Sequence, residues 1–533
     1  MKLGPFLIFF FLYFSLTAQQ TVGLFLNDST ATPGYTLFGN NKITYLIDNC
    51  GLVVNSWKSD YKPGESMYLL ENGNLLRTAQ LESSFDAGGV GGRFELFSWE
   101  GDLLWSYQYA SEELQAHHDI APLPNGNFLF TAWEKHSEAE AKAMGRVPDG
   151  PVWSERIVEL EPLGRDEARI VWQWRLWDHL VQDQDPAKPN FGAIHTHPGS
   201  VNINYLGEEA ETSGNWVHLN AIDYNAALDQ IAVSSRLFSE IWIIDHNTTT
   251  EEASGSKGDL LYRYGNPQAY GRGTGTDQRF FHQHDAHWVP DDYPFGGSLM
   301  VFNNEAENAQ SGVELWTPPL SPTGDYLLEG ENSFGPQNVD WAYTAPDFYS
   351  RYMSGAHVLP NGHVFICEGM KGRFFEINPD KEIVWEYINP VNANGGPVAQ
   401  GGTVRFNQTF RATKYPIAFP AFQGRNLIPG KPVEINPWET DCFIPDTDTV
   451  RAIQASDIKI LGNPVKDQIV IEADIGSQEL SLKIIDMIGV VKKKQTIHGG
   501  QNHIYINDLP AGIFFLAFSA GSDIFYTFKI VLL

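Results

Sequence analysis

The stretch PLPNGNFLF at residues 122–130 decides the fold, because it joins two apolar runs through a two-residue turn. Asn-Gly between apolar runs is a strong hairpin signal, since both residues tolerate a positive φ. The pattern recurs as LLENGNLL at residues 69–76 and as VLPNGHVF at residues 358–365. A hairpin that recurs in this way predicts a repeat architecture of short antiparallel strands.

A second element completes the repeat: a strand, a turn and a strand that ends in an aromatic residue. It is found at residues 94–107, 157–174, 241–264 and 374–387. Four short antiparallel strands per repeat predict one blade of a β-propeller. Two further inner halves are expected at residues 218–235 and 284–302. Residues 43–57 form an outer half without an inner half before it, and we expect its partner around residues 403–421. The count predicts an all-β chain with a six-bladed β-propeller.

The charge of the chain argues against nucleic acid as a partner. The 533 residues include 65 acidic and 36 basic side chains, which gives a net charge of −29. A surface of this sign repels a phosphate backbone, so only a local basic site could bind an anion.

The first residues have the layout of a secretory signal peptide, which we place at residues 1–18. No later segment is apolar enough to predict a transmembrane span. Export permits one disulfide among the three cysteines. Cys50 and Cys442 lie near the two ends of the expected propeller (residues 19–445), and their pairing would clamp these ends, an option that the sequence leaves open. Cys367 lies in an apolar run and is expected to be a small buried hydrophobe.

The character of the chain changes after Pro445. Residues 446–455 are expected to be a linker, and residues 456–533 alternate between strands and turns. This pattern predicts a separate, small C-terminal β-sandwich.

The histidine-rich stretch FHQHDAHW at residues 281–288 is the leading candidate for chemistry. In an extended segment His282 and His284 would point to one side and His287 to the other. Inner strands of a propeller surround its centre, so we expect His118, His218 and His284, which open such strands, to converge. Ser354 occupies the position in its repeat that His118 occupies in its own.

Arg236 follows the strand of the His218 repeat, and on this acidic chain it predicts an anion site, with a simple salt bridge as the alternative. The pairs His282/His284 and His195/His197 have a spacing that could chelate a metal. A zinc site would need a third ligand, which the sequence does not offer, so no metal is expected. His195 and His197 lie within residues 178–215, which are too long for an ordinary connection and are expected to be an insertion over one face.

Several motifs resemble those of the bacterial arylsulfate sulfotransferases. They are VHLNAIDYN (217–225), EIWIIDH (240–246), YGNP (264–267), QHDAH (283–287) and FRA (410–412) with Tyr415, within a likeness that runs from about Asp48 to Pro437. The resemblance implies a six-bladed propeller that moves a sulfuryl group between phenols.

The resemblance also implies roles for single residues. His284 matches the nucleophilic histidine, His118 and His218 match the two supporting histidines, and Arg236 and Asn220 match the family's arginine and asparagine. His117 competes with His118 for its role. His117 and His282, like Asn220, are candidates for substrate binding.

The chemistry implied is ping-pong transfer through a sulfohistidine, with aryl sulfates and phenols as substrates and no cofactor. Phe280, Phe281, Trp288 and Tyr349 are candidates for a phenol pocket, although core packing is the more expected role of each. Two alternatives stay open. One is a non-catalytic propeller that binds a surface partner or a glycan, and the other is a metal-dependent propeller enzyme.

The C-terminal segment resembles the sorting domain of proteins exported by the type IX secretion system. The matching pieces are Asn463–Val465, Ile485-Asp486 with Gly489, Leu509–Phe514 and Lys529–Val531. The resemblance implies the secretion machinery as a partner and a secreted or cell-surface protein.

Overall fold

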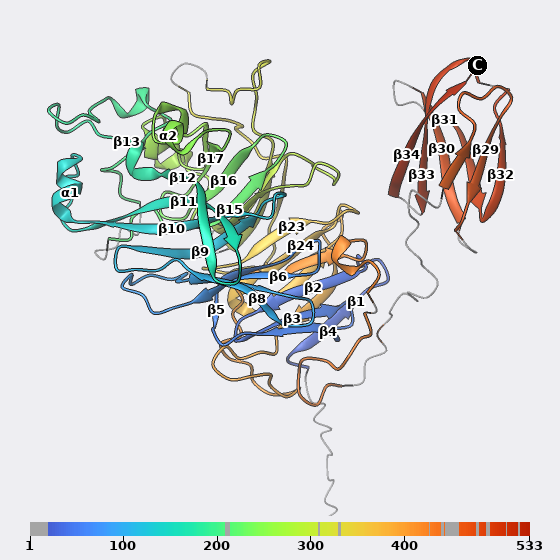
Figure 1. The fold of residues 1–533 in the computed structure, drawn as a ribbon, viewed down its shortest axis with the longest axis horizontal. Helices are drawn as coiled ribbons and strands as arrows, with labels where there is room; N and C mark the ends of the chain where they lie inside the picture. Colours follow the sequence, from blue (N-terminus) through green and yellow to red (C-terminus); the bar gives the residue numbers. More distant parts are fainter. Residues whose placement is uncertain are drawn as a thin grey trace, which may run out of the picture. The chain divides into compact units, whose positions relative to one another are not determined.

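The computed structural model describes residues 20–207, 214–307, 310–328, 332–425, 427–438, 442, 458–475, 479–486, 491–507, 509–520 and 523–532. The chain divides into two compact units, Met1–Phe443 and Ile444–Leu533 (Figure 1). The expected signal peptide (1–18) and the expected linker (446–455) lie outside the described residues and stay predictions.

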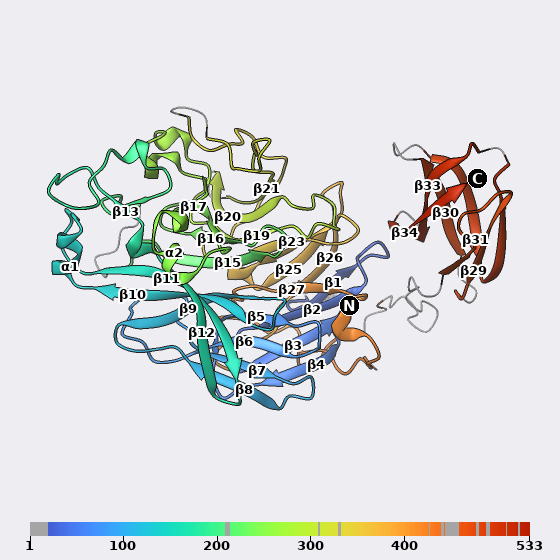
Figure 2. The ribbon, with the colours of Figure 1, turned by 45° about the horizontal axis from the view of Figure 1, so that its top comes forward.

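The first unit contains, in its described residues, six antiparallel sheets of four or five strands (Figures 1 and 2). Four of them are meanders of consecutive strands. Their strands are β5 (Pro63–Leu69), β6 (Leu75–Gln80), β7 (Gly92–Phe97) and β8 (Leu103–Gln108); β9 (Leu114–Pro122), β10 (Phe128–His136), β11 (Val152–Leu163) and β12 (Glu167–Arg175); β15 (Leu219–Asn225), β16 (Gln230–Ser235), β17 (Glu240–Asp245) and β18 (Tyr262–Tyr264); and β19 (His284–Trp288), β20 (Leu299–Glu307), β21 (Gln310–Trp316) and β22 (Trp341–Tyr343).

The remaining two sheets combine strands from both ends of the unit. One has the order β27 (Thr413–Pro416), β2 (Gly34–Gly39), β3 (Ile43–Asp48) and β4 (Val53–Lys58). The other has the order β23 (Gly355–Val358), β24 (Val364–Glu368), β25 (Arg373–Ile377), β26 (Ile383–Ile388) and β1 (Gly23–Asn27).

Contacts between the sheets close them into a ring. The strands β2, β5, β9, β15, β19 and β23 contact one another in this order, and β24 contacts β27, which lies in the sheet of β2. Short antiparallel sheets around a centre are the architecture of a β-propeller, which confirms the predicted fold class.

One detail of the prediction was wrong. The outer half at residues 43–57 does have an inner strand before it, because β2 pairs with both β3 and β27. The C-terminal side therefore supplies one strand of this sheet rather than two, and that strand, β27, lies within the expected residues 403–421.

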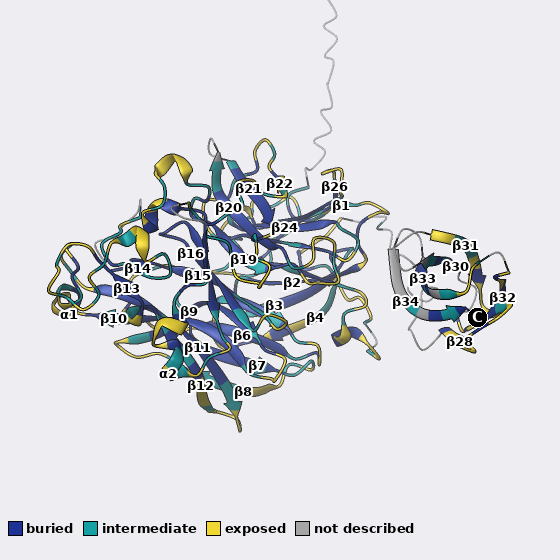
Figure 3. Cartoon of the chain, turned by 90° about the horizontal axis from the view of Figure 1, so that it is seen from above, coloured by how far each residue is buried: buried dark blue, intermediate teal, exposed yellow. Residues whose placement is uncertain are grey.

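A tryptophan of the fourth strand, counted from the inner edge of the sheet, links neighbouring sheets. Trp57 in β4 donates from Nε1 to the carbonyl of Ser98, and Trp105 in β8 donates to that of Glu167. Trp385 in β26 donates to Asn49 O and so joins the last sheet to the first. These contacts explain why the outer strand of the repeat ends in aromatic residues. Figure 3 shows inner and middle strands such as β6 and β24 largely in the colour of buried residues.

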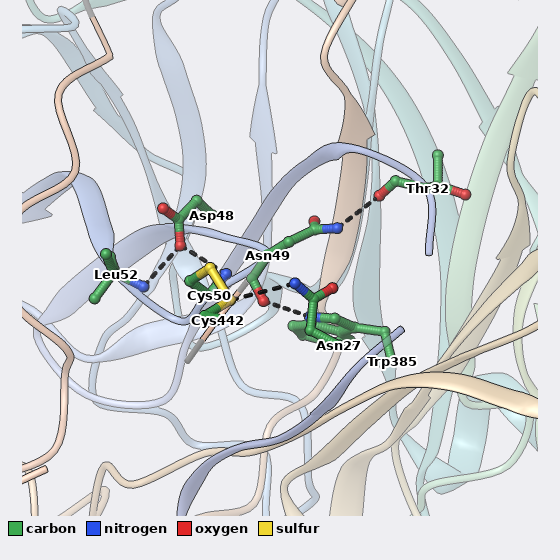
Figure 4. The surroundings of a disulfide bond; sticks show 8 residues. All are labelled: Asn27, Thr32, Asp48, Asn49, Cys50, Leu52, Trp385 and Cys442. Carbon is green, nitrogen blue, oxygen red and sulfur yellow. Dashed lines mark hydrogen bonds between the residues drawn. A yellow bond between two sulfur atoms is a disulfide. The ribbon is translucent and has the colours of Figure 1, made fainter. Parts of the chain in front are cut away.

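The two ends of the propeller are also joined covalently. Cys50 and Cys442 form a disulfide with a Cα–Cα distance of 5.7 Å, across 392 positions of the sequence. Figure 4 shows it beside Asp48, whose carboxylate accepts from the amides of Cys50 and Leu52. Cys367 is buried and unpaired, as expected.

Shorter elements connect the strands. The helices are α1 (Glu138–Ala143) and α2 (Thr250–Ala253), and the insertion at residues 178–215 carries β13 (Leu180–Val181) and β14 (Val201–Asn202), which pair in parallel. None of the helices among the described residues has the length and apolar character needed to cross a membrane.

The second unit consists of two sheets. One has the order β28 (Ile458–Leu461), β29 (Gln468–Ala473) and β32 (Gly500–Tyr505). The other has the order β31 (Val491–His498), β30 (Glu479–Asp486), β33 (Gly512–Ala520) and β34 (Asp523–Leu532). A buried cluster that includes Ile471, Leu482, Ile504 and Leu516 draws side chains from both sheets. This arrangement is a small β-sandwich.

Candidate active site

The innermost strands of the propeller carry unusual backbone conformations within them or just before them. Glu65, His118 and Ser354 have positive φ values of 101°, 51° and 86°. Each lies five residues before the leucine that opens a hairpin turn, so the three occupy equivalent positions. His218, which opens the sheet of β15, has φ of 59°. Non-glycine residues adopt this region rarely, and such residues concentrate at functional sites.

Three imidazoles meet at these positions. The ring centroids of His118 and His218 lie 4.7 Å apart, and His284 is close enough to contribute to the lowered pKa of His218. Burial holds the pKa of each of the three well below that of an ordinary histidine, and the nearby cation of Arg236 lowers each pKa further. The structure therefore brings the predicted residues together as three neutral imidazoles beside one guanidinium.

The proton of His284 is fixed by Asn304, a residue that the sequence did not single out. The amide nitrogen of Asn304 donates to the carbonyls of Ser350 (2.7 Å) and Met353 (3.0 Å). Its oxygen must therefore face Nδ1 of His284, 2.8 Å away, and accept a proton from it. Nε2 of His284 consequently carries the lone pair, as a nucleophile requires.

His117 does not face the site. Its Nε2 lies 2.8 Å from Oε2 of Glu155, its Nδ1 lies 2.9 Å from Nδ1 of His118, and its ring stacks on Trp133. Both nitrogens are thus occupied within the protein. Nε2 of His118 has no hydrogen-bond partner among the described residues, so His118 is the better placed of the two to meet a substrate.

Aromatic rings border the site. Phe410 lies with its centroid 6.0 Å from that of His118 and 6.3 Å from that of His284. The guanidinium of Arg236 lies 5.7 Å from the ring centre of Tyr352, which is partly exposed. By contrast, Phe280 and Trp288 belong to a hydrophobic core cluster, the more expected of their two roles.

The strand geometry assumed for His282 was wrong. The strand β19 begins at His284, and His282 precedes it with φ of 56°. The ring of His282 lies 3.1 Å from Oε2 of Glu305, whose other oxygen accepts from Tyr349. His282 thus has a partner of its own beside the site.

Asn220 is buried, and its amide nitrogen donates to the carbonyl of Gln283 at 2.7 Å. It therefore supports the backbone that precedes His284. The side chain of Gln283 adds to this support through donors to Ser235 O and Glu240 O.

A buried ion cluster holds the backbone beside two of the histidines. Arg411 donates to both carboxylate oxygens of Asp119 at 3.2 and 3.0 Å, and its Nε lies 2.7 Å from Oδ1 of Asp285. Asp119 follows His118 in the chain, and Asp285 follows His284. One arginine thus connects the residues next to both imidazoles.

Glu65 is a further residue that the sequence reasoning missed. It has the position in its sheet that His118 has in its own, and it is partly exposed. Although Glu65 is partly exposed, the protein around its carboxyl group excludes much of the water and raises the pKa of Glu65 to about 7. Its register with the Asn-Gly turns of the repeat could have identified it.

His197 of the insertion does not join the site. His197 bonds through Nδ1 to the nearby carbonyl of Ala193 and is exposed. In the part of the chain that the structure describes, no group of three or more His, Cys, Asp or Glu side chains is arranged to hold a metal ion.

Comparison with solved structures gives propeller-like neighbours at low similarity. A Bacteroides caccae protein of unknown function has 13% identity and a TM-score of 0.37 over 67% of this chain and 94% of that one. A periplasmic gluconolactonase of Pseudomonas aeruginosa has 10% identity and a TM-score of 0.35 over 89% and 99%. A streptogramin B lyase has 13% identity and a TM-score of 0.34 over 72% and 88%.

Comparison with protein families is more informative. No curated protein matches the chain. The family "Secretion system C-terminal sorting domain" matches residues 459–532, which indicates export by the type IX system and a secreted or cell-surface location. The family "Arylsulfotransferase (ASST)" matches residues 17–401, more than half of the chain. With the histidines and Arg236 gathered at the centre of its propeller, the chain belongs to the arylsulfotransferase family.

Proposed function

We propose that the protein transfers a sulfuryl group from an aryl sulfate to another phenol through a sulfohistidine at His284. The observation that carries this proposal is the hydrogen bond from His284 Nδ1 to Asn304, which leaves the lone pair on Nε2. A neutral, oriented imidazole next to a guanidinium suits attack on an anionic sulfate ester.

In the first half-reaction, Nε2 of His284 attacks sulfur and the bond between sulfur and the aryl oxygen breaks. The aryl oxygen leaves with the electron pair and takes a proton from His118 or His218. Arg236 stabilises the charge that gathers on the sulfuryl oxygens. In the second half-reaction, an acceptor phenol returns a proton to the histidine that protonated the leaving group and attacks sulfur, and the electron pair of the S–N bond returns to Nε2.

The aromatic residues at the site support a phenolic substrate. The ring of Phe410 lies beside those of His118 and His284. The guanidinium of Arg236 lies over the ring of Tyr352, and an aryl ring of the substrate could stack on either aromatic side chain. The partial exposure of Tyr352 is compatible with a position at the entrance.

The test is the intact mass of the protein after brief exposure to 4-nitrophenyl sulfate, with phenolate release followed by absorbance. We expect a gain of one SO₃ group, which a phenol acceptor removes and His284→Ala abolishes. His246→Ala is the control, because His246 is a partly buried imidazole that pairs with Asp229 and Glu159 away from the site. Release without an adduct would refute the sulfohistidine. No release from any aryl sulfate would favour a binding propeller.

A further inference from the structure

Glu155, His117 and His118 form an unbroken chain of hydrogen bonds that ends at the site. Oε2 of Glu155 lies 2.8 Å from Nε2 of His117, and Nδ1 of His117 lies 2.9 Å from Nδ1 of His118. All three side chains are buried. Nε2 of His118, the outer end of the chain, faces no hydrogen-bond partner within the described residues.

The bulge in β9 makes this chain possible. In a regular strand two successive side chains point to opposite faces and their rings cannot meet. Here His117 pairs with Thr131 while Ile120 pairs with Phe130, so two extra residues bulge out of the strand, and His118 has a positive φ. The bulge turns the ring of His118 toward that of His117.

Two packing contacts hold the rings in place. The ring of His117 lies flat on Trp133, with centroids 4.1 Å apart. A Cβ atom at Gly89 would come within 1.9 Å of the ring of His118, so the backbone of Gly89 lies directly against it. These two contacts restrict how each ring can turn.

The protonation of the chain follows from its environment. Glu155 is fully buried, and burial raises the pKa of its carboxyl well above that of an exposed glutamate. Burial lowers the pKa of both histidines. The resting chain therefore has a proton on Glu155 Oε2, which donates to His117; Nδ1–H of His117 donates to His118, and His118 holds its proton on Nε2. The amide of Leu219 donates to the other oxygen of Glu155 at 2.9 Å, which leaves Oε2 for His117.

We propose that Glu155 and His117 are positioning residues of a proton relay that keeps His118 ready to protonate the departing phenolate. This proposal rests on the proposed function and specifies which histidine acts as its acid. His118 gives its Nε2 proton to the aryl oxygen as the S–O bond breaks. Nδ1 of His118 takes the proton of His117 Nδ1, and Nε2 of His117 takes that of Glu155.

The charges and protons of the first half-reaction balance. The donor brings one negative charge, the sulfuryl group leaves the aryl oxygen for His284, the phenol departs neutral, and the negative charge remains on Glu155. Transfer to the acceptor runs the chain backwards, because the proton of the acceptor enters at His118 Nε2 and restores the acid at Glu155. No external acid or base is needed in either half.

Glu155→Gln tests the relay, because glutamine still donates to His117 but cannot give up a proton. We expect release of 4-nitrophenol, a good leaving group, to stay near the wild-type rate. Release of a poor leaving group such as 4-methylphenol should fall about 100-fold, the low end of the usual contribution of general acid catalysis. The matched control is Glu376→Gln, which changes a buried carboxyl that pairs with His363 (2.6 Å) away from the site. An equal loss for both leaving groups in Glu155→Gln would overturn the relay.

Infrared spectroscopy tests the resting proton without turnover. At pH 7 the carbonyl band of a protonated carboxyl should be lost in Glu155→Gln and kept in Glu376→Gln, since the pKa of Glu376 is lowered to about 2 by Lys414 and His363 despite its burial. Loss of a carboxylate band from Glu155→Gln instead would overturn the proposal. If no aryl sulfate reacts with the wild type, the proposed function fails, and the infrared result still decides the protonation of Glu155.

Should Glu155→Gln not fold, rates of the wild type in mixtures of H₂O and D₂O replace it. With the poor leaving group, a nonlinear dependence of the release rate on the deuterium fraction of the solvent supports the transfer of several protons in the rate-limiting step. A linear dependence would contradict the relay, because it indicates that only one proton moves in the rate-limiting step.

Discussion

Asn304→Leu is the substitution that most directly probes the nucleophile. Leucine fills a similar volume but removes the acceptor of His284 Nδ1 and the donors to the carbonyls of Ser350 and Met353. Without that acceptor the imidazole can hold its proton on Nε2, where it blocks attack on sulfur.

The expected losses of stability and of reaction rate follow from the hydrogen bonds that Asn304→Leu removes. Three hydrogen bonds at a net value of about 1 kcal/mol each predict a fall of about 3 kcal/mol in the free energy of unfolding. One buried hydrogen bond that selects the reactive tautomer is worth about 1–3 kcal/mol, which corresponds to a rate of sulfohistidine formation that is lower by about 5- to 150-fold.

The assay is the pre-steady-state burst of phenolate from 4-nitrophenyl sulfate, together with chemical denaturation. Asn303→Leu is the matched control, because Asn303 is equally buried and also makes three hydrogen bonds, with Phe281 N, Arg279 O and Glu314. We expect similar losses of stability and a much slower burst only for Asn304→Leu. Burst rates of the two variants within about threefold of each other would refute the assignment of the tautomer.

Three further outcomes follow from the geometry of the site. Gly89→Ala should lower kcat/KM by about tenfold or more, because the added Cβ would displace the ring of His118. Gly88→Ala, with open space around its Cβ, is the control. Equal activities of the two variants would contradict the contact between Gly89 and His118. Arg411→Met leaves two buried carboxylates unpaired and should lower the free energy of unfolding by about 3–5 kcal/mol, measured by denaturant titration; unchanged stability would mean that the carboxylates become protonated. The pKa of His284 is held low by burial, so its neutral, reactive form persists as the pH falls below the usual range for histidine. The acid limb of kcat/KM with a substrate that does not titrate should therefore lie well below pH 6.5, and a limb at that pH would point to an ordinary imidazole.

The sequence predicted the parts of the fold that carry local signals. The Asn-Gly turns at residues 72–73 and 125–126 form the expected hairpins between β5 and β6 and between β9 and β10. The strand β2 was missed because the connection to β3 contains no Asn-Gly pair and its apolar run, Leu37-Phe38, is short. The strand β1 escaped notice because it joins a sheet whose other strands lie more than 300 residues later.

The candidate site was predictable only where motifs mark it. His118, His218, His284 and Arg236 stand in recognisable positions, and the structure gathers them. Glu155 and Asn304 are different, because they lie 38 and 20 residues from the imidazoles that they contact and sit within otherwise ordinary strands. Only the pairing of strands, together with bulges that break the alternation of side chains, brings such partners together.

The disulfide of Cys50 and Cys442 bears on what happens when the sorting domain is pulled. Cys442 is the last residue of the first unit that the structure describes, so this covalent anchor lies at the C-terminal end of the described propeller chain. Traction on the C-terminal segment during export would pass through this bond to the turn between β3 and β4, and would not peel β27 from the sheet that it completes. Proteolysis beyond Cys442 would likewise leave the anchor in place. We therefore expect the ring of the propeller to stay closed when the sorting domain is removed.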